Sequence, residues 1–243
     1  MPFRKRRRCG CGCLSLAVLV ALIFALYDSN TRIITQEYEL SFANLPPGFD
    51  RYRIAVVSDV HAKAFGKNNA RLVAAVKGAN PDIIAVTGDL IDGKNQLDIV
   101  LPLIDRLVEI APVYFVTGNH EWDSGEVKPL FTALSERQVH VMRNALAILE
   151  RGGDTITLVG LEDPNGPRDM RTPEEMFAQV SAGQFTVALV HRNSFLHRIA
   201  ALGGDLILSG HAHGGIVRLP FTDGLIDHAG FFPTHTSGVY TEG

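Results

Sequence analysis

The sequence predicts an α/β fold, because short apolar segments alternate along the chain with amphipathic helical segments. Five of the apolar segments are rich in β-branched residues, as buried strands are, and metal-seeking side chains follow each within two residues. These predicted strands cover residues 53–58, 83–87, 113–117, 186–190 and 206–209. Ligands can form a site at the carboxyl ends of strands in open α/β sheets, so we expect these side chains to converge on one edge.

The segments between the strands complete the prediction. Amphipathic helices are expected at residues 69–78, 96–110, 127–138, 173–182 and 194–202. A further strand is expected at residues 155–161, and another follows a tight turn at residues 216–220. Residues 31–50 contain Pro46-Pro47-Gly48 and are expected to form an edge strand and a turn.

The first 30 residues form a separate unit. Five basic residues at positions 4–8 precede an apolar run at 14–27, which reaches 19 residues if 9–13 are included, near the lower limit of roughly 17 to 25 for a spanning helix. Because Leu26-Tyr27-Asp28 is a poor cleavage site, an uncleaved signal anchor is favoured over a signal peptide. The positive-inside rule then predicts a single-pass cell-membrane protein with its catalytic domain outside the cytoplasm. The predicted organisation is an anchor at 1–30, a linker with an edge strand at 31–52, and a catalytic domain at 53–243.

The composition and charge of the chain limit the kinds of partner that it can bind. The chain has 243 residues, of which 46% are hydrophobic and 20% charged, as in ordinary globular proteins. The net charge is -3, and residues 1–32 hold six basic side chains and one acidic one, so the remainder is acidic. An acidic domain excludes nucleic acid as the primary partner. All three cysteines, Cys9, Cys11 and Cys13, lie in the anchor. They are interpreted either as small residues tolerated at a membrane boundary or as acylation sites.

The side chains after the strands suit a pair of divalent metal ions. The seven candidate ligands are Asp59, His61, Asp89, Asn119, His191, His211 and His213. Two such ions need a bridging carboxylate, for which Asp89 is the candidate. With Asp59, His61 and His213 it would complete one site, and with Asn119, His191 and His211 the other. This mixture of imidazole, carboxylate and carboxamide suits Mn, Fe or Zn, among which the sequence does not choose.

The predicted chemistry is hydrolysis of a phosphate ester by a metal-bound hydroxide, because metal binding lowers the pKa of water to about 7. His120 is the candidate general acid for the leaving oxygen, and Asp92 is the candidate partner that orients its ring. The other histidines, His140, His197, His228 and His235, are expected to be ordinary surface residues.

Taken in order, the segments Asp59-Val60-His61, Gly88-Asp89, Gly118-Asn119-His120-Glu121, His191 and Gly210-His211-Ala212-His213 resemble the calcineurin-like metallophosphoesterase family. Residues 208–215 and 218–220 are similar to the membrane-anchored bacterial group around YkuE and YaeI. The resemblance implies a sandwich of two β-sheets flanked by helices, a two-metal centre, and the ligand roles given above.

Three departures from the family pattern matter. Gly93 stands where protein Ser/Thr phosphatases carry a phosphate-gripping arginine, which disfavours a phosphoprotein substrate. Arg192-Asn193 follows His191 in place of the frequent Asn-Pro. The chain also ends where close relatives usually continue, so we expect either a truncated product or a second sheet that lacks an edge strand.

Three functional hypotheses follow. The leading one is a membrane-anchored phosphodiesterase or phosphomonoesterase, and the anchor suggests a lipid-linked phosphate ester as substrate. The second, also from resemblance, is a cytoplasmic hydrolase of a UDP-diacylglucosamine-type pyrophosphate. The third is a non-catalytic scaffold, which is disfavoured because all seven ligands are present. The sequence has no Gly-x-Ser-x-Gly segment and no Walker loop, and it does not indicate an oligomeric state.

Overall fold

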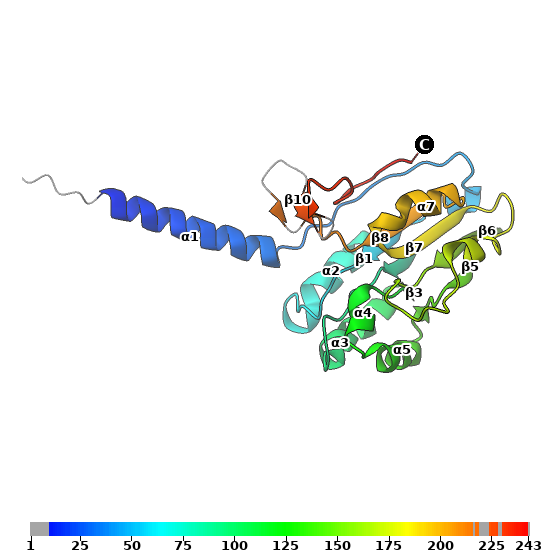
Figure 1. Ribbon diagram of the computed structural model, residues 1–243, viewed down its shortest axis with the longest axis horizontal. Helices are drawn as coiled ribbons and strands as arrows, with labels where there is room; N and C mark the ends of the chain where they lie inside the picture. The colour runs from blue at the N-terminus through cyan, green and yellow to red at the C-terminus, as the bar shows by residue number, and fades with distance from the viewer. Residues whose placement is uncertain (1–9, 216, 219–223, 228–229, 243) are drawn as a thin grey trace, which may run out of the picture. The chain divides into compact units, whose positions relative to one another are not determined.

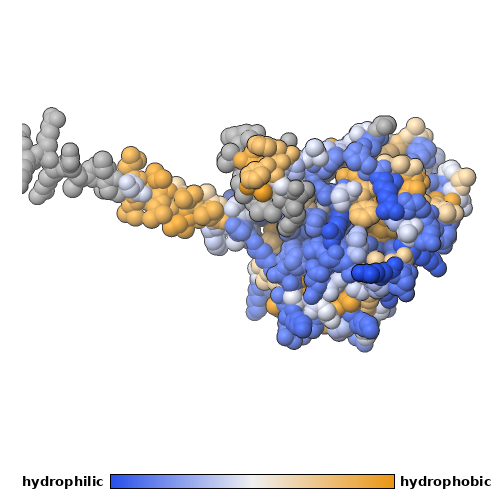
Figure 2. Space-filling model, in the orientation of Figure 1, coloured by the Kyte–Doolittle hydropathy of each residue, from blue (hydrophilic) through white to orange (hydrophobic). Residues whose placement is uncertain are grey.

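A computed structural model describes residues 10–215, 217–218, 224–227 and 230–242, and the chain divides into two compact units, Met1–Gln36 and Glu37–Gly243 (Figure 1). The first unit holds α1 (Gly10–Thr31), whose 22 residues extend about 33 Å. Within α1, Leu14–Thr31 has a mean hydropathy of 1.6 and is long and apolar enough to cross a membrane, a test that a signal sequence also passes. Its surface is apolar, whereas the visible face of the second unit is mostly hydrophilic (Figure 2).

The second unit is built on two four-stranded sheets. The first sheet has the order β1-β2-β3-β4 with all neighbours parallel: β1 (Ile54–Val57), β2 (Ile83–Val86), β3 (Val113–Phe115) and β4 (His140–Val141). The second has the order β5-β6-β7-β8, with β5 antiparallel to β6 and the other neighbours parallel: β5 (Ala145–Arg151), β6 (Asp154–Gly160), β7 (Thr186–Arg192) and β8 (Leu206–Gly210). A small antiparallel sheet holds β9 (Val217–Arg218), β10 (Gly224–Asp227) and β11 (Gly230–Phe231).

Strand alternation explains how the two large sheets pack. In β2, Ile83 and Ala85 point into a core shared with the second sheet, while Ile84 and Val86 point into a core shared with helices. In β7, Val187 and Leu189 face the core between the sheets, whereas Ala188 and Val190 face the opposite side. The expected two-sheet sandwich flanked by helices is therefore confirmed.

Helices cover both outer faces. On the first sheet lie α2 (Ala70–Ala79), α3 (Leu97–Val108) and α5 (Val127–Glu136), and on the second lie α6 (Pro173–Phe177) and α7 (Leu196–Ala201) (Figure 1). The buried positions of α3 are Val100, Leu103, Ile104 and Leu107, a spacing that places them on one helical face. Short 3-10 turns lie at Pro47–Phe49, Lys67–Asn69 and Asn193–Phe195.

Several elements differ from the sequence prediction. The strands β4, β5, β10 and β11 and the short helix α4 (Asn119–Asp123) were not predicted. Helix α6 ends at Phe177 rather than near 182, because the following amides of Gln179 and Val180 donate to carbonyls only three residues back, at Met176 and Phe177. The expected strand at 216–220 is described only as β9, and residues 216, 219 and 220 lie outside the described residues, as does His228.

The prediction of an edge strand within residues 31–50 was wrong, because the described residues 32–46 form no strand. Side chains rather than strand pairing attach this segment to the domain. The ring of Phe42 packs against Phe185 at 5.1 Å, and the Asn44 amide donates to Asp205 Oδ1 at 2.7 Å.

Candidate metal centre

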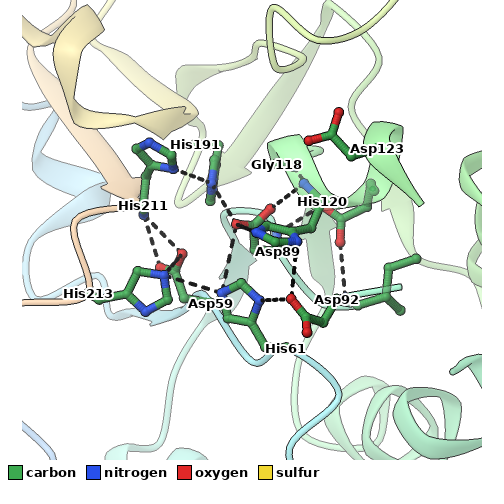
Figure 3. A network of polar contacts seen from close by, with 12 residues as sticks. Asp59, His61, Asp89, Asp92, Gly118, His120, Asp123, His191, His211 and His213 are labelled. Carbon is green, nitrogen blue, oxygen red and sulfur yellow. Dashed lines mark hydrogen bonds and ion pairs between the residues drawn. The ribbon is translucent and has the colours of Figure 1, made fainter. Parts of the chain in front are cut away.

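The site lies where the carboxyl ends of strands from both large sheets meet. From the first sheet, Asp59 and His61 follow β1, Asp89 follows β2, and α4, which begins after β3, carries Asn119 and His120. From the second sheet, His191 lies in β7, and His211 and His213 follow β8. Figure 3 shows the aspartate and histidine side chains of this set pointing toward one another around Asp89. The predicted convergence therefore occurs, but across two sheets rather than along one edge.

The first group of ligands is Asp59, His61 and His213, whose candidate ligand atoms all lie within 4.8 Å of one another. His61 Nε2 and His213 Nε2 face each other at 3.3 Å, and His213 Nε2 lies 3.6 Å from Asp59 Oδ1. The Asp59 carboxylate also accepts the backbone amide of His211 at 3.0 Å, which joins the end of β1 to the end of β8.

The second group is Asp89, His191 and His211. His191 is fully buried, and its Nε2 lies 3.1 Å from both Asp89 Oδ2 and His211 Nδ1. Its Nδ1 lies 2.8 Å from the carbonyl oxygen of Thr87, which can only accept, so Nδ1 carries a proton and Nε2 faces the cluster. Burial opposes charge on His191, but the hydrogen bond and negative charge of Asp89 raise its pKa. Burial would raise the pKa of Asp89, yet its bonds and charge interactions with His191 and His120 lower it.

The donor set fits divalent metal ions. Asn119 Oδ1 is buried and accepts no hydrogen bond from the described residues, a costly arrangement unless a cation or donor occupies the space before it. Ring nitrogens of His61 and His213, and of His191 and His211, also face each other at 3.3 and 3.1 Å, so each pair could turn its nitrogens to a shared cation. Asp89 Oδ2 reaches both groups, at 3.1 Å from His191 Nε2 and 3.8 Å from His61 Nε2. Six of the seven predicted ligands thus lie in these two groups, and Asn119 begins α4 next to His120, whose backbone amide donates to Asp89 Oδ1 at 2.9 Å.

His120 and Asp92 lie together, as their predicted pairing requires. His120 Nδ1 is 3.1 Å from Asp92 Oδ1, and His120 Nε2 lies 4.0 Å from Asp89 Oδ2. The same Asp92 oxygen is 3.2 Å from His61 Nδ1, so one carboxylate contacts two rings of the cluster. Asp92 is half-exposed, which leaves this side of the site open to solvent.

Glu121 has a structural role that was not predicted from the sequence. Its fully buried carboxylate accepts four backbone amides: Oε2 accepts those of Asp89 at 2.8 Å and Gly118 at 2.7 Å, and Oε1 accepts those of Leu90 at 2.7 Å and Ile91 at 3.1 Å. Burial raises the pKa of Glu121, and these hydrogen bonds act against that rise. Glu121 stands three residues after Gly118, the residue that precedes α4, and a glutamate at that position often caps a helix. This spacing is the sequence signal that could have revealed the contact with Gly118.

Arg192 was noted as a departure, but its partner was not foreseen. Its Nε donates to Asp163 Oδ2 at 2.7 Å and its Nη2 to Asp163 Oδ1 at 3.0 Å, while Asp163 is almost completely buried. Nη2 also donates to Asn165 Oδ1 at 2.9 Å, and Asn165 in turn donates to Asp123 of α4 at 3.0 Å. The pKa of Arg192 is raised, first by its hydrogen bond to Asp163 and further by the charges of Asp163, Asp123 and Asp89.

The backbone at the ligands is strained, as at many functional sites. Five ligands have left-handed φ angles: Asp59 (53°), His61 (48°), Asp89 (51°), His211 (69°) and His213 (53°). Glycine is required where the ligand loops touch: a Cβ on Gly118 would overlap the Asp89 carboxylate, and one on Gly210 would overlap Ser58 and Asp59.

Comparison with known proteins agrees with this geometry. Residues 52–215 match the family described as Calcineurin-like phosphoesterase. The chain belongs to the calcineurin-like phosphoesterase family. Its members bind divalent metal ions and hydrolyse phosphoric esters, so the chain is a metal-dependent phosphoesterase.

Named relatives of this calcineurin-like phosphoesterase include membrane proteins. It is 28% identical to the metallophosphoesterase YkuE of Bacillus subtilis over 90% of the chain and 78% of YkuE. It is 25% identical to a transmembrane protein with metallophosphoesterase domain from Danio rerio, covering 93% of the chain but only 58% of that protein. Sulfate thiohydrolase SoxB of Thermus thermophilus shares the fold, with 16% identity, a TM-score of 0.50, and coverage of 74% of the chain and 50% of SoxB.

Proposed function

We propose that this phosphoesterase is a membrane-anchored phosphodiesterase with a dinuclear metal centre. The observation that carries the proposal is the place of Asp89 between two ligand groups. Its Oδ2 lies within 4 Å of His191 in one group and of His61 in the other. A carboxylate that reaches both groups is what a pair of neighbouring cations requires.

The six proposed ligands other than Asp89 fall into two sets, one for each ion. Asp59, His61 and His213 would hold one ion and Asn119, His191 and His211 the other, with Asp89 shared between them. Bound ions supply an activated water and neutralise charge on the phosphate oxygens. Mn, Fe or Zn suits these ligands. The burial of His191 and Asp89 keeps this side of the centre dry, which strengthens the electrostatic contribution of each ligand.

His120 donates a proton to the leaving oxygen. Its ring is held through Nδ1 by Asp92, so Nε2 is the atom directed toward the ligand cluster. An imidazole held by a carboxylate keeps the orientation that proton transfer requires.

Arg192 contributes the positive charge that binds the substrate phosphate. Asp163 engages its Nε and Nη2, and no described hydrogen bond uses Nη1. A guanidinium fixed on one edge by a buried carboxylate presents its remaining N–H groups with little loss of side-chain entropy. The arginine therefore stands beside His191 as a rigid anion-binding group, although Gly93 offers none.

The substrate is proposed to be a lipid-linked phosphate ester outside the cytoplasm. The length and hydropathy of α1 support a single-pass anchor, and the basic residues at positions 4–8 support a cytoplasmic N-terminus. An anchored domain has access to esters that remain at the membrane surface.

The test is manganese-dependent hydrolysis by the full chain in detergent micelles, compared with its Asp89→Asn variant. We expect a bis-aryl phosphodiester to be cleaved faster than an aryl phosphomonoester, and two manganese ions per chain in the wild type. Loss of both activity and manganese in the variant supports the dinuclear enzyme. If both proteins hydrolyse the esters only at the background rate, with or without manganese, the result would point to a non-catalytic scaffold instead.

Topology is tested separately. A reporter active only outside the cytoplasm, fused after Gly243, is expected to be active. Activity of a cytoplasmic reporter at the same position would contradict the proposed location and favour a substrate such as a UDP-diacylglucosamine on the cytoplasmic side.

A further inference from the structure

A second cluster of metal-binding side chains lies away from the centre just described. It consists of His197 on α7 together with His235 and Glu242, and its candidate ligand atoms all lie within 4.8 Å of one another. Both histidines were predicted from the sequence to be ordinary surface residues. They instead meet across a single carboxylate, although they come from segments 38 residues apart.

The distances among the three side chains are compatible with a shared cation. His197 Nδ1 lies 2.7 Å from Glu242 Oε2, and His235 Nε2 lies 3.7 Å from Glu242 Oε1, which is too long for a hydrogen bond. Tetrahedral zinc with bonds of about 2.0 to 2.2 Å holds neighbouring ligand atoms about 3.3 Å apart. The two distances, which involve different oxygens of Glu242, lie on either side of that value, and all three candidate ligand atoms lie within 4.8 Å of one another. The cluster is therefore near the size that one zinc ion requires.

The surroundings already orient the ligands. Thr234 Oγ1 lies 3.1 Å from His235 Nδ1, so this hydroxyl can accept a hydrogen bond from the Nδ1–H group and leave the Nε2 lone pair facing Glu242. The His235 ring packs edge-on against Tyr240 at 4.6 Å, and its backbone carbonyl accepts the amide of Asn193 at 2.6 Å.

The segment between His235 and Glu242 is also folded on itself. The Tyr240 hydroxyl accepts the backbone amide of Thr236 at 3.1 Å and donates to the carbonyl of Ser237 at 2.9 Å. These contacts hold His235 and Glu242 near each other before any ion arrives, which reduces the entropy lost on binding.

We propose that His197, His235 and Glu242 form a peripheral zinc site. Two imidazoles and one carboxylate are an established zinc ligand set, with one position open to water. The exposed ring of His197 provides the entry path, with 72% of its side chain accessible. Zinc binding joins the segment 235–242 to α7 and so stabilises the folded domain. The site shares no ligand with the dinuclear centre and does not depend on the phosphoesterase activity.

The test uses the full chain in micelles and an Asp89→Asn background, which weakens the dinuclear centre. Each protein is equilibrated with zinc chloride, passed through a desalting column and assayed for zinc by mass spectrometry. Adding His197→Ala is expected to remove one zinc ion per chain, and adding Glu242→Gln should do the same. Zinc should raise the melting temperature of Asp89→Asn by more than that of Asp89→Asn/His197→Ala.

A matched control is His140→Ala, because His140 lies in β4, stacked on Tyr114 and outside the cluster. The control should retain the zinc ion that His197→Ala loses. Unchanged zinc content in both His197→Ala and Glu242→Gln would overturn the proposal. If Asp89→Asn does not fold, the wild type is compared with the single variants, where the difference must again be one ion. Manganese-dependent phosphoesterase activity in His197→Ala should equal that of the wild type, so failure of this site is distinguishable from failure of the proposed function.

Discussion

Glu121 holds the backbone of Asp89 in place from a distance of 32 residues. Its Oε2 accepts the amide of Asp89 at 2.8 Å, and the same oxygen accepts the amide of Gly118 at 2.7 Å. One buried carboxylate therefore joins the loop after β2 to the loop after β3. Because Asp89 has a left-handed φ of 51°, its backbone needs such support to keep the carboxylate directed at both ligand groups.

Glu121→Gln is expected to lower the free energy of unfolding by about 2 to 4 kcal/mol, because either orientation of the amide leaves two backbone donors facing an NH₂ group. Urea denaturation of the metal-free protein measures this loss. The control Glu136→Gln, at an exposed position of α5, should change stability by less than about 0.5 kcal/mol. A variant as stable as the wild type would show that Glu121 does not fix the loop.

Asn119→Ala should have opposite effects with and without metal. In chelator, removal of a buried amide oxygen without a described partner should leave stability unchanged or raise it by about 1 kcal/mol. With excess manganese, each tenfold loss of metal affinity should lower stability by about 1.4 kcal/mol.

Thermal melts in chelator and in manganese measure this reversal of sign. The control is Asn144→Ala, because Asn144 is also buried but accepts the amide of Glu162 at 3.0 Å. It should destabilise the protein equally in both conditions. Equal destabilisation by Asn119→Ala in both conditions would argue against a metal at its oxygen.

The parts of the site that could be predicted from sequence are those set by position along a strand. Asp59 and Asp89 lie two and three residues after β1 and β2, His191 lies next to the last residue of β7, and the carboxyl ends of parallel strands form binding edges. The division of those strands between two sheets was not visible in their periodicity, since β2 is buried throughout and β7 at every position except its last residue. The prediction of two sheets came instead from the resemblance of the ligand motifs to those of the family.

Other features depend on contacts that local sequence does not encode. The strand β5 contains Ala, Leu, Glu and Arg, which favour helices, and its seven-residue pairing with β6 overrides that preference. The bidentate contact between Arg192 and Asp163 joins residues 29 apart in sequence. Likewise His197 and His235 follow no common motif, so only the folded chain brings them to Glu242.

His120→Asn should reduce the turnover of alkyl phosphodiesters about 10²- to 10⁴-fold, because their leaving alkoxide needs a proton. Aryl esters with acidic leaving groups should lose much less, and bound manganese should not change. The measurement is kcat for a matched alkyl and nitrophenyl pair of esters. Equal losses for both leaving groups would exclude the role of general acid and indicate a role in binding or electrostatics.

Arg192→Ala should raise KM about 10- to 100-fold with little change in kcat, as expected when a charged hydrogen bond to the substrate is lost in both ground and transition states. Manganese content should be unchanged. Arg198→Ala is the matched control, since Arg198 pairs with Glu174 on α6, outside the centre. An unaltered KM in Arg192→Ala would limit this arginine to a structural contact with Asp163.

Tyr52 should make the domain sensitive to alkaline pH. Burial, assisted by the negative charge of Asp82, raises the pKa of Tyr52 from 10.0 to about 12. Below pH 10 the phenol is protonated in both the folded and the unfolded chain, but between pH 10 and 12 only the unfolded chain ionises. Stability should therefore fall as pH rises through this window, and Tyr52→Phe should lose less stability across it than the wild type. Urea midpoints at pH 9, 10 and 11 measure the difference, with Tyr38→Phe as the exposed control. Parallel pH dependence in the wild type and Tyr52→Phe would show that Tyr52 ionises alike in both states, because the phenylalanine variant cannot ionise at that position.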